Sequence, residues 1–145
     1  MSKLDFHTED LKSLKISELK RIAEYWFRQH LLKIVERDYR NRIKCPLKNK
    51  WYKEDKMQVA HFRDRNHLDT AFDLDNCHLI SETSNLWDSK IKKEGYKSLH
   101  HYEYEIWLRT FLEEEKINKY LHGKRDLTIF ARDQYKKAIN DYRRQ

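Results

Sequence analysis

Three polar residues in the middle of the chain have the types and the spacing for chemistry on a phosphodiester. His61 ends a short alternating segment, Asn76 precedes a second apolar segment, and Asn85 falls one turn into a predicted helix. A histidine on a rigid strand suits a base that deprotonates water. An asparagine on a facing helix offers a hard oxygen ligand to a divalent cation, and a second one can hold the histidine in its useful orientation. Taken singly, each has an ordinary structural explanation, but together they favour metal-assisted hydrolysis.

Two short strands and a helix are expected to position these residues. Alternation predicts a strand over 57–61, and a return strand over 77–80 follows a polar segment over 63–75. A helix is predicted to begin near Ser81, a candidate N-cap, with Glu82 in its first turn, and to run to about Lys93. The expected unit is a β-hairpin followed by a helix.

Amphipathic helices are predicted on both sides of this unit. Apolar residues recur at helical spacing over 19–35, which predicts one long helix over 17–39, and again over 104–112 and 127–142. We expect an α+β, mainly α fold in a single domain over 1–145. Its helical segments over 1–44 and 96–145 would enclose the β-hairpin–helix core over 45–95.

Composition limits the compartment and the partners. The formal net charge of +7 favours a polyanionic partner such as nucleic acid over a merely soluble basic protein. The two cysteines, Cys45 and Cys77, are expected to be buried apolar residues in a reducing compartment, because they form no Cys-x-x-Cys pair. The N-terminus is too polar for a signal peptide, and no stretch approaches the roughly 18 apolar residues of a membrane span. We expect a soluble, cytoplasmic protein with no membrane partner.

Basic residues near the three polar positions are candidates for gripping phosphates. They are Arg63, Arg65, Lys90, Lys92, Lys93 and Lys97. A second candidate strip consists of Arg37, Arg40, Arg42, Lys44, Lys48 and Lys50. Either group could instead be a solvated basic face. Because no segment has the pattern of a base-reading helix, we expect DNA to be recognised by its shape or backbone.

The order of these motifs resembles the HNH core of the NinG/Rap family of phage recombination nucleases. The matching segments are Ala60-His61-Phe62, Phe72-Asp73-x-x-Asn76-x-His78 and Ser81-x-x-Ser84-Asn85, with Glu36-Arg37-Asp38 and Cys45 upstream. The resemblance covers about residues 32–97. It implies a ββα-metal nuclease module that acts on branched or recombining DNA, in the host cytoplasm if the chain is phage-encoded. A homodimer would suit a two-fold junction substrate.

The resemblance also implies roles for single residues. His61 would be the general base, and Asn76 would hold the loop and His61. Asn85 would bind the catalytic cation, magnesium or manganese, and His78 would be a second ligand of that cation.

Two departures from the family pattern bear on metal binding. The zinc-knuckle cysteine pairs read Cys45-x-x-Lys48 and Ser81-x-x-Ser84, so a structural zinc is not expected. Ala60 stands where many HNH sites have an aspartate. Either Asp73, Asp75, Asp88 or His78 supplies the missing ligand, or metal binding is weak. Two alternatives to a nuclease therefore remain. One is a non-catalytic nucleic-acid binder on a decayed HNH core, and the other is a phage protein that binds a host protein.

Overall fold

The computed structural model describes residues 6, 10–83 and 99–143. The fold is α+β and mainly helical, as predicted. Contacts divide the chain into two compact units, one of Met1–Ile34 with Asp126–Gln145 and one of Val35–Arg125. This division differs from the expected consecutive segments, because the last helix belongs with the first while the helices in between belong with the central strands. None of the helices in the described ranges is both long and apolar enough to cross a bilayer.

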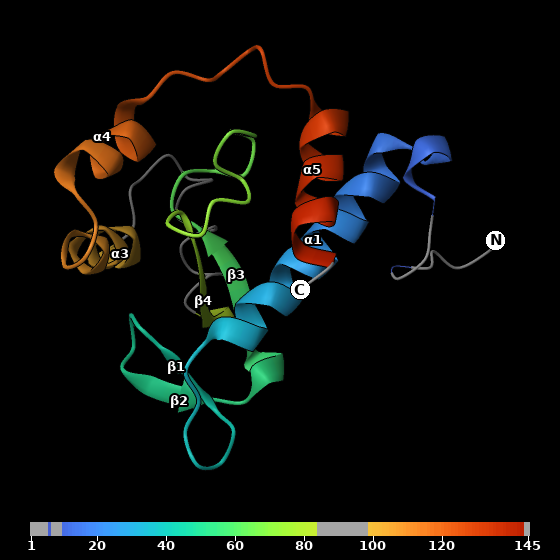
Figure 1. The fold of residues 1–145 in the computed structure, drawn as a ribbon. Coiled ribbons are helices and arrows are strands. Elements are labelled where there is room, and N and C mark those ends of the chain that lie inside the picture. Colours follow the sequence, from blue (N-terminus) through green and yellow to red (C-terminus); the bar gives the residue numbers. More distant parts are fainter. Residues whose placement is uncertain (1–5, 7–9, 84–98, 144–145) are drawn as a thin grey trace. The chain divides into compact units, whose positions relative to one another are not determined.

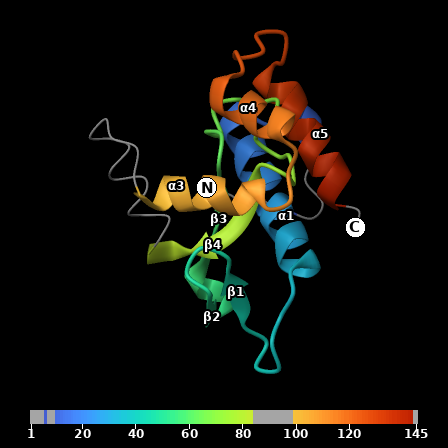
Figure 2. The same ribbon diagram turned by 90° about the vertical axis from the view of Figure 1, so that its left-hand side faces the viewer.

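The first unit is a pair of helices. The 3-10 helix η1 (Leu11–Ser13) leads into α1 (Ile16–Ile34), and α1 packs along α5 (Ala131–Arg143), as both views show (Figures 1 and 2). Five of the six buried residues of α1 belong to the predicted apolar stripe, namely Leu19, Ile22, Ala23, Phe27 and Leu31. The sixth, Leu32, was not predicted, and two stripe residues, Trp26 and Ile34, are not buried. The ring of Phe27 lies 5.1 Å from that of Tyr142, centroid to centroid. Apolar burial between two amphipathic helices holds this unit together.

The ends of α1 differ from the expected range of 17–39. The Lys15 backbone N–H donates to Glu18 Oε1 at 3.1 Å, which is one half of a capping box. Ser17, the expected N-cap, therefore lies inside the first turn. The helix ends at Ile34, earlier than expected, because the chain then turns into the first β-hairpin.

The second unit contains two antiparallel hairpins (Figure 1). The first pairs β1 (Ile43–Cys45) with β2 (Lys50–Tyr52), and the second pairs β3 (Met57–His61) with β4 (Cys77–Ser81). A 3-10 helix, η2 (Glu54–Lys56), connects them. The predicted strands over 57–61 and 77–80 are confirmed, whereas the first hairpin was not predicted. Its three-residue strands are too short to show alternation.

Helices α3 (Leu99–Arg109) and α4 (Glu114–His122) complete the second unit (Figure 2). The pattern over 104–112 predicted α3, whose Tyr104 and Leu108 are buried, but α4 was not singled out. After β4, residues 82 and 83 are helical, and the rest of the helix predicted to run to Lys93 lies outside the described residues.

Candidate active site

The His61 ring is oriented by a backbone carbonyl. His61 is the last residue of β3 and is half-buried, and its Nε2 lies 2.8 Å from the carbonyl oxygen of Ala71. Because a carbonyl can only accept, Nε2 carries the hydrogen of this bond. The lone pair of the neutral ring is then on Nδ1, so Nδ1 is the atom that can take a proton. The tautomer expected of a general base is thus set by the loop that follows the strand.

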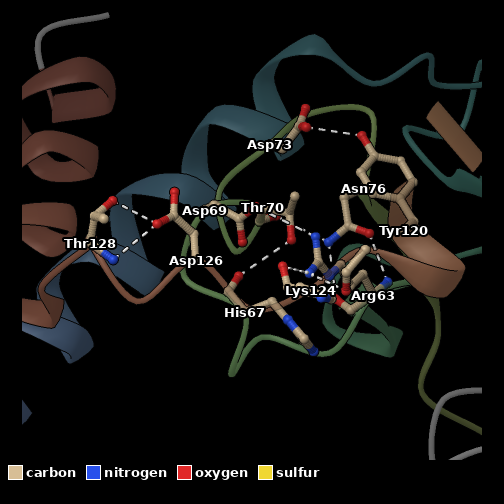
Figure 3. Close-up of polar contacts among 11 residues, drawn as sticks. Arg63, His67, Asp69, Thr70, Asp73, Asn76, Tyr120, Lys124, Asp126 and Thr128 are labelled. Atoms are coloured by element: carbon tan, nitrogen blue, oxygen red, sulfur yellow. Dashed lines mark hydrogen bonds and ion pairs between the residues drawn. The ribbon is translucent and has the colours of Figure 1, made fainter. Parts of the chain in front are cut away.

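Asn76 closes that loop with its side-chain amide (Figure 3). The residue is completely buried; its Oδ1 accepts from the Arg63 N–H at 2.7 Å, and its Nδ2 donates to the carbonyls of Arg63 and Thr70 at 3.0 Å each. All polar atoms of the amide face backbone groups, which would otherwise be buried without partners. Since Ala71 follows Thr70, the same contacts hold the carbonyl that orients His61. The structure therefore joins two of the predicted residues, His61 and Asn76, through one loop.

Asp73 anchors the other end of the loop to α4. Its Oδ1 accepts from the Asp75 N–H at 3.0 Å, and its Oδ2 accepts from the Tyr120 hydroxyl at 2.9 Å (Figure 3). Burial, and then this hydrogen bond to Asp73, raises the pKa of Tyr120 well above its usual range. Asp75 forms an ion pair with Lys116. Both aspartates, which were considered as replacements for a missing metal ligand, therefore hold the loop on α4.

Arg63 does not have the exposed position expected of a phosphate contact. Its side chain is only 3% exposed, and its Nη1 lies 3.4 Å from Asp69 Oδ2. Its Nη2 donates to the carbonyls of Gly123 and Lys124 at 3.0 Å each, just after α4 (Figure 3). Carbonyls at a helix C-terminus need donors, and a guanidinium supplies several. We correct the expectation accordingly: Arg63 ties the loop to the end of α4, while Arg65 is exposed.

His78 contacts aromatic side chains on the opposite face of the β3–β4 hairpin from His61. In the strand register Ala60 lies opposite His78 and His61 opposite Cys77, so alternation directs the two histidines to different faces. His78 Nδ1 lies 2.7 Å from the Tyr104 hydroxyl, and the Trp107 ring lies 4.8 Å away, centroid to centroid.

Burial lowers the pKa of His78 to about 4, although Asp75 and Asp73 oppose this shift. The ring is therefore neutral at pH 7. Its hydrogen bond and ring contacts in this structure are with α3. His78 was expected to share a cation with Asn85, which lies outside the described residues, so that expectation stays a prediction.

The remaining predicted site residues lie outside the described residues. They are Asn85, Lys90, Lys92, Lys93 and Lys97. In the described ranges no group of three or more His, Cys, Asp or Glu residues is placed to hold a metal ion.

Both cysteines are buried and free, as expected. Burial raises the pKa of the Cys77 thiol, with a further contribution from Asp73. Cys45 Sγ accepts from the Ser81 N–H at 3.3 Å. In the resemblance to the NinG/Rap family, Cys45 and Ser81 take the positions of the first cysteine of each zinc-knuckle pair, and the fold brings these two positions into contact.

Two important groups were missed by sequence reasoning. The Ala71 carbonyl has no sequence signature, because any residue supplies one. Tyr104 was predicted only as a member of the apolar stripe of a helix. That pattern could not predict that its hydroxyl contacts His78. The chain matches no known family model, no curated protein and no solved structure at a significant level.

Proposed function

We propose that the Val35–Arg125 unit is an HNH-type nuclease module that hydrolyses phosphodiester bonds in DNA. The observation that carries the proposal is the hydrogen-bonded path from Asn76 through the Thr70–Ala71 backbone to His61 Nε2. A general base needs a fixed ring and a defined tautomer, and this path supplies both. The net charge of +7 suits a polyanionic substrate.

The contact between Cys45 and Ser81 supports the same proposal independently. The two residues are far apart in the sequence, yet Sγ and the backbone nitrogen lie 3.3 Å apart. A chance match of short motifs would not require these positions to meet. Their approach is expected if the chain retains the knuckle geometry of the NinG/Rap family and has lost its zinc.

In the proposed reaction, His61 Nδ1 takes a proton from the attacking water as the water oxygen bonds to phosphorus. The P–O bond to the leaving sugar oxygen breaks, and that oxygen takes a proton from solvent water. Nε2–H stays hydrogen-bonded to the Ala71 carbonyl oxygen, and the partial negative charge of that oxygen stabilises the imidazolium that forms. Asn76 is a positioning residue, because it acts through the loop backbone. A magnesium or manganese ion would offset phosphate charge in such a reaction, and Asn85 is the residue proposed to bind it.

The test is cleavage of duplex, single-stranded and branched DNA with magnesium, manganese or EDTA. We expect metal-dependent cleavage that falls by about 10²- to 10⁴-fold in His61→Ala, the usual range for a lost general base. His122→Ala, at an exposed position on α4, is the matched control and should retain activity. Cleavage that survives His61→Ala would refute the assignment of the base.

A non-catalytic nucleic-acid binder is the second candidate, and Ala60 favours it. Ala60 is 3% exposed and has no side-chain oxygen to offer as a ligand at the position where many HNH sites have an aspartate. This candidate predicts salt-sensitive DNA binding without cleavage in magnesium, manganese or EDTA. Binding that persists while every substrate remains intact would select it over the nuclease.

A further inference from the structure

A rigid turn over residues 37–43 precedes the β1–β2 hairpin. Asp38 Oδ1 accepts from the backbone N–H groups of Arg40 and Arg42 at 3.0 and 2.8 Å, and Asp38 Oδ2 accepts from Arg42 Nε at 2.9 Å. The Asp38 N–H also donates to the Arg42 carbonyl at 3.0 Å. Asn41 is in the left-handed region at φ 61°, which asparagine tolerates better than most residues. These contacts leave the turn little freedom.

This turn displays an aromatic ring in solvent. Tyr39 is 87% exposed, although a tyrosine ring usually gains by being buried. The Arg40 guanidinium lies 5.4 Å from the centre of the ring. In proteins that bind single-stranded nucleic acid, unpaired bases stack on exposed aromatic rings, and a nearby arginine adds a cation–π contribution. The packing of the unit does not explain why the turn carries a large aromatic side chain at its tip.

The turn and the first hairpin form one basic surface. Arg37 connects them: its Nη2 donates to Glu54 Oε2 at 3.0 Å, its Nη1 donates to the Asn41 carbonyl at 3.3 Å, and its backbone pairs with Ile43. The turn and hairpin are adjacent in Figure 1. This surface, residues 36–56, has eight Lys and Arg against four Asp and Glu, an excess of four positive charges.

Two of the four acidic residues on this surface form ion pairs with arginines of the same surface. Asp38 pairs with Arg42 and Glu54 pairs with Arg37. The remaining basic side chains, all exposed, are Arg40, Lys44, Lys48, Lys50, Lys53 and Lys56. Lys44 lies opposite Trp51 in the register of the hairpin, so a second cation and a half-buried aromatic residue share its outer face. Aromatic residues among exposed cations characterise surfaces that bind single-stranded nucleic acid.

We propose that the surface formed by residues 36–56 binds single-stranded nucleic acid, with an unpaired base stacked on Tyr39 and the exposed basic residues on the phosphates. A duplex keeps its base faces stacked internally, so the ring of Tyr39 selects for unpaired segments such as those at branches or ends. The inference rests on the proposed function only in taking nucleic acid as the ligand, and it does not require cleavage.

The first test is fluorescence anisotropy with a labelled oligo-dT strand and a duplex of equal length. We expect Tyr39→Ala to weaken single-strand binding by at least about fivefold, the lower end of what one stacked base contributes. Tyr39→Phe keeps the ring and should bind like the wild type. Tyr102→Ala, at a tyrosine 47% exposed on α3, is the matched control and should also bind like the wild type.

Three outcomes would overturn the proposal. Tyr39→Ala could bind like the wild type, Tyr102→Ala could lose as much, or the protein could bind only the duplex. Circular dichroism of each variant checks that it folds. Because the Tyr39 side chain is exposed, Tyr39→Ala should fold like the wild type.

A salt titration tests the phosphate contacts. If Lys44 contacts a phosphate, Lys44→Gln should reduce the slope of log K against log salt by about 0.7, the value for one contact on a single strand. Lys119→Gln, at an exposed position on α4, should leave the slope unchanged. An unchanged slope in Lys44→Gln would refute that contact. His61→Ala should bind the single strand normally. If the wild type cleaves no substrate but binds the single strand, and Tyr39→Ala weakens that binding, the nuclease proposal is rejected and this surface is left standing.

Discussion

Replacing Asn76 by alanine tests whether one buried amide holds the candidate site together. The substitution removes three hydrogen bonds of 2.7, 3.0 and 3.0 Å, and it leaves one N–H and two carbonyls in a completely buried position. At about 1 kcal/mol for each bond, with more wherever a buried group finds no new partner, we expect the free energy of unfolding to fall by about 3 kcal/mol.

The assay is urea unfolding followed by circular dichroism, with cleavage measured in parallel. Asn66 is the matched control, because it is an exposed asparagine in the same loop. Asn66→Ala should change the free energy of unfolding by no more than about 0.5 kcal/mol. A loss below about 1 kcal/mol in Asn76→Ala, or equal losses in the two variants, would refute the argument that Asn76 closes the loop.

Asn76→Asp separates hydrogen bonding from packing, because it keeps the size of the side chain. The new carboxylate would face two carbonyl oxygens, so its pKa should rise above the unfolded value of about 3.9. The folded chain then binds the proton more readily than the unfolded chain. The penalty of the variant, measured against the wild type at the same pH, should therefore shrink as the pH falls from 7 to about 5. A penalty independent of pH would contradict this reasoning.

Three further predictions follow from the site. The His78 pKa of about 4 lies below its unfolded value of 6.5, so the free energy of unfolding should fall by up to about 3 kcal/mol as the pH falls through that interval; urea titrations of His78→Gln should show a weaker dependence. Arg63→Met breaks a buried ion pair and two bonds to carbonyls, so unfolding should cost about 3 kcal/mol less, whereas exposed Arg65→Met should stay within about 0.5 kcal/mol. The last prediction restores thiols around Cys45 by Lys48→Cys, Ser81→Cys and Ser84→Cys. If the knuckle geometry persists, this variant should bind one zinc ion per chain, and cobalt substitution should give the absorption bands of a tetrahedral thiolate site, whereas a variant that binds no metal would count against the resemblance.

Local patterns were sufficient for the elements that carry the candidate site. Alternation over 57–61 and the apolar run over 77–80 predicted β3 and β4, since side chains on a half-buried hairpin must alternate. Helical periodicity likewise predicted the buried stripe of α1. The same patterns did not predict the β1–β2 hairpin, because strands of three residues are too short to show an alternating pattern.

The sequence by itself determined the residue types at the candidate site and the strand that carries His61. Only the tertiary structure decided which groups meet. The carbonyl that orients His61 belongs to Ala71, and a backbone group leaves no trace in the sequence. Arg63 was expected on the surface, but it is buried, because its guanidinium donates to the backbone carbonyls just after α4. His78 matched a ligand in type and spacing, but strand alternation and α3 placed it among aromatic rings. These assignments depend on contacts between residues distant along the chain, which local periodicity cannot encode.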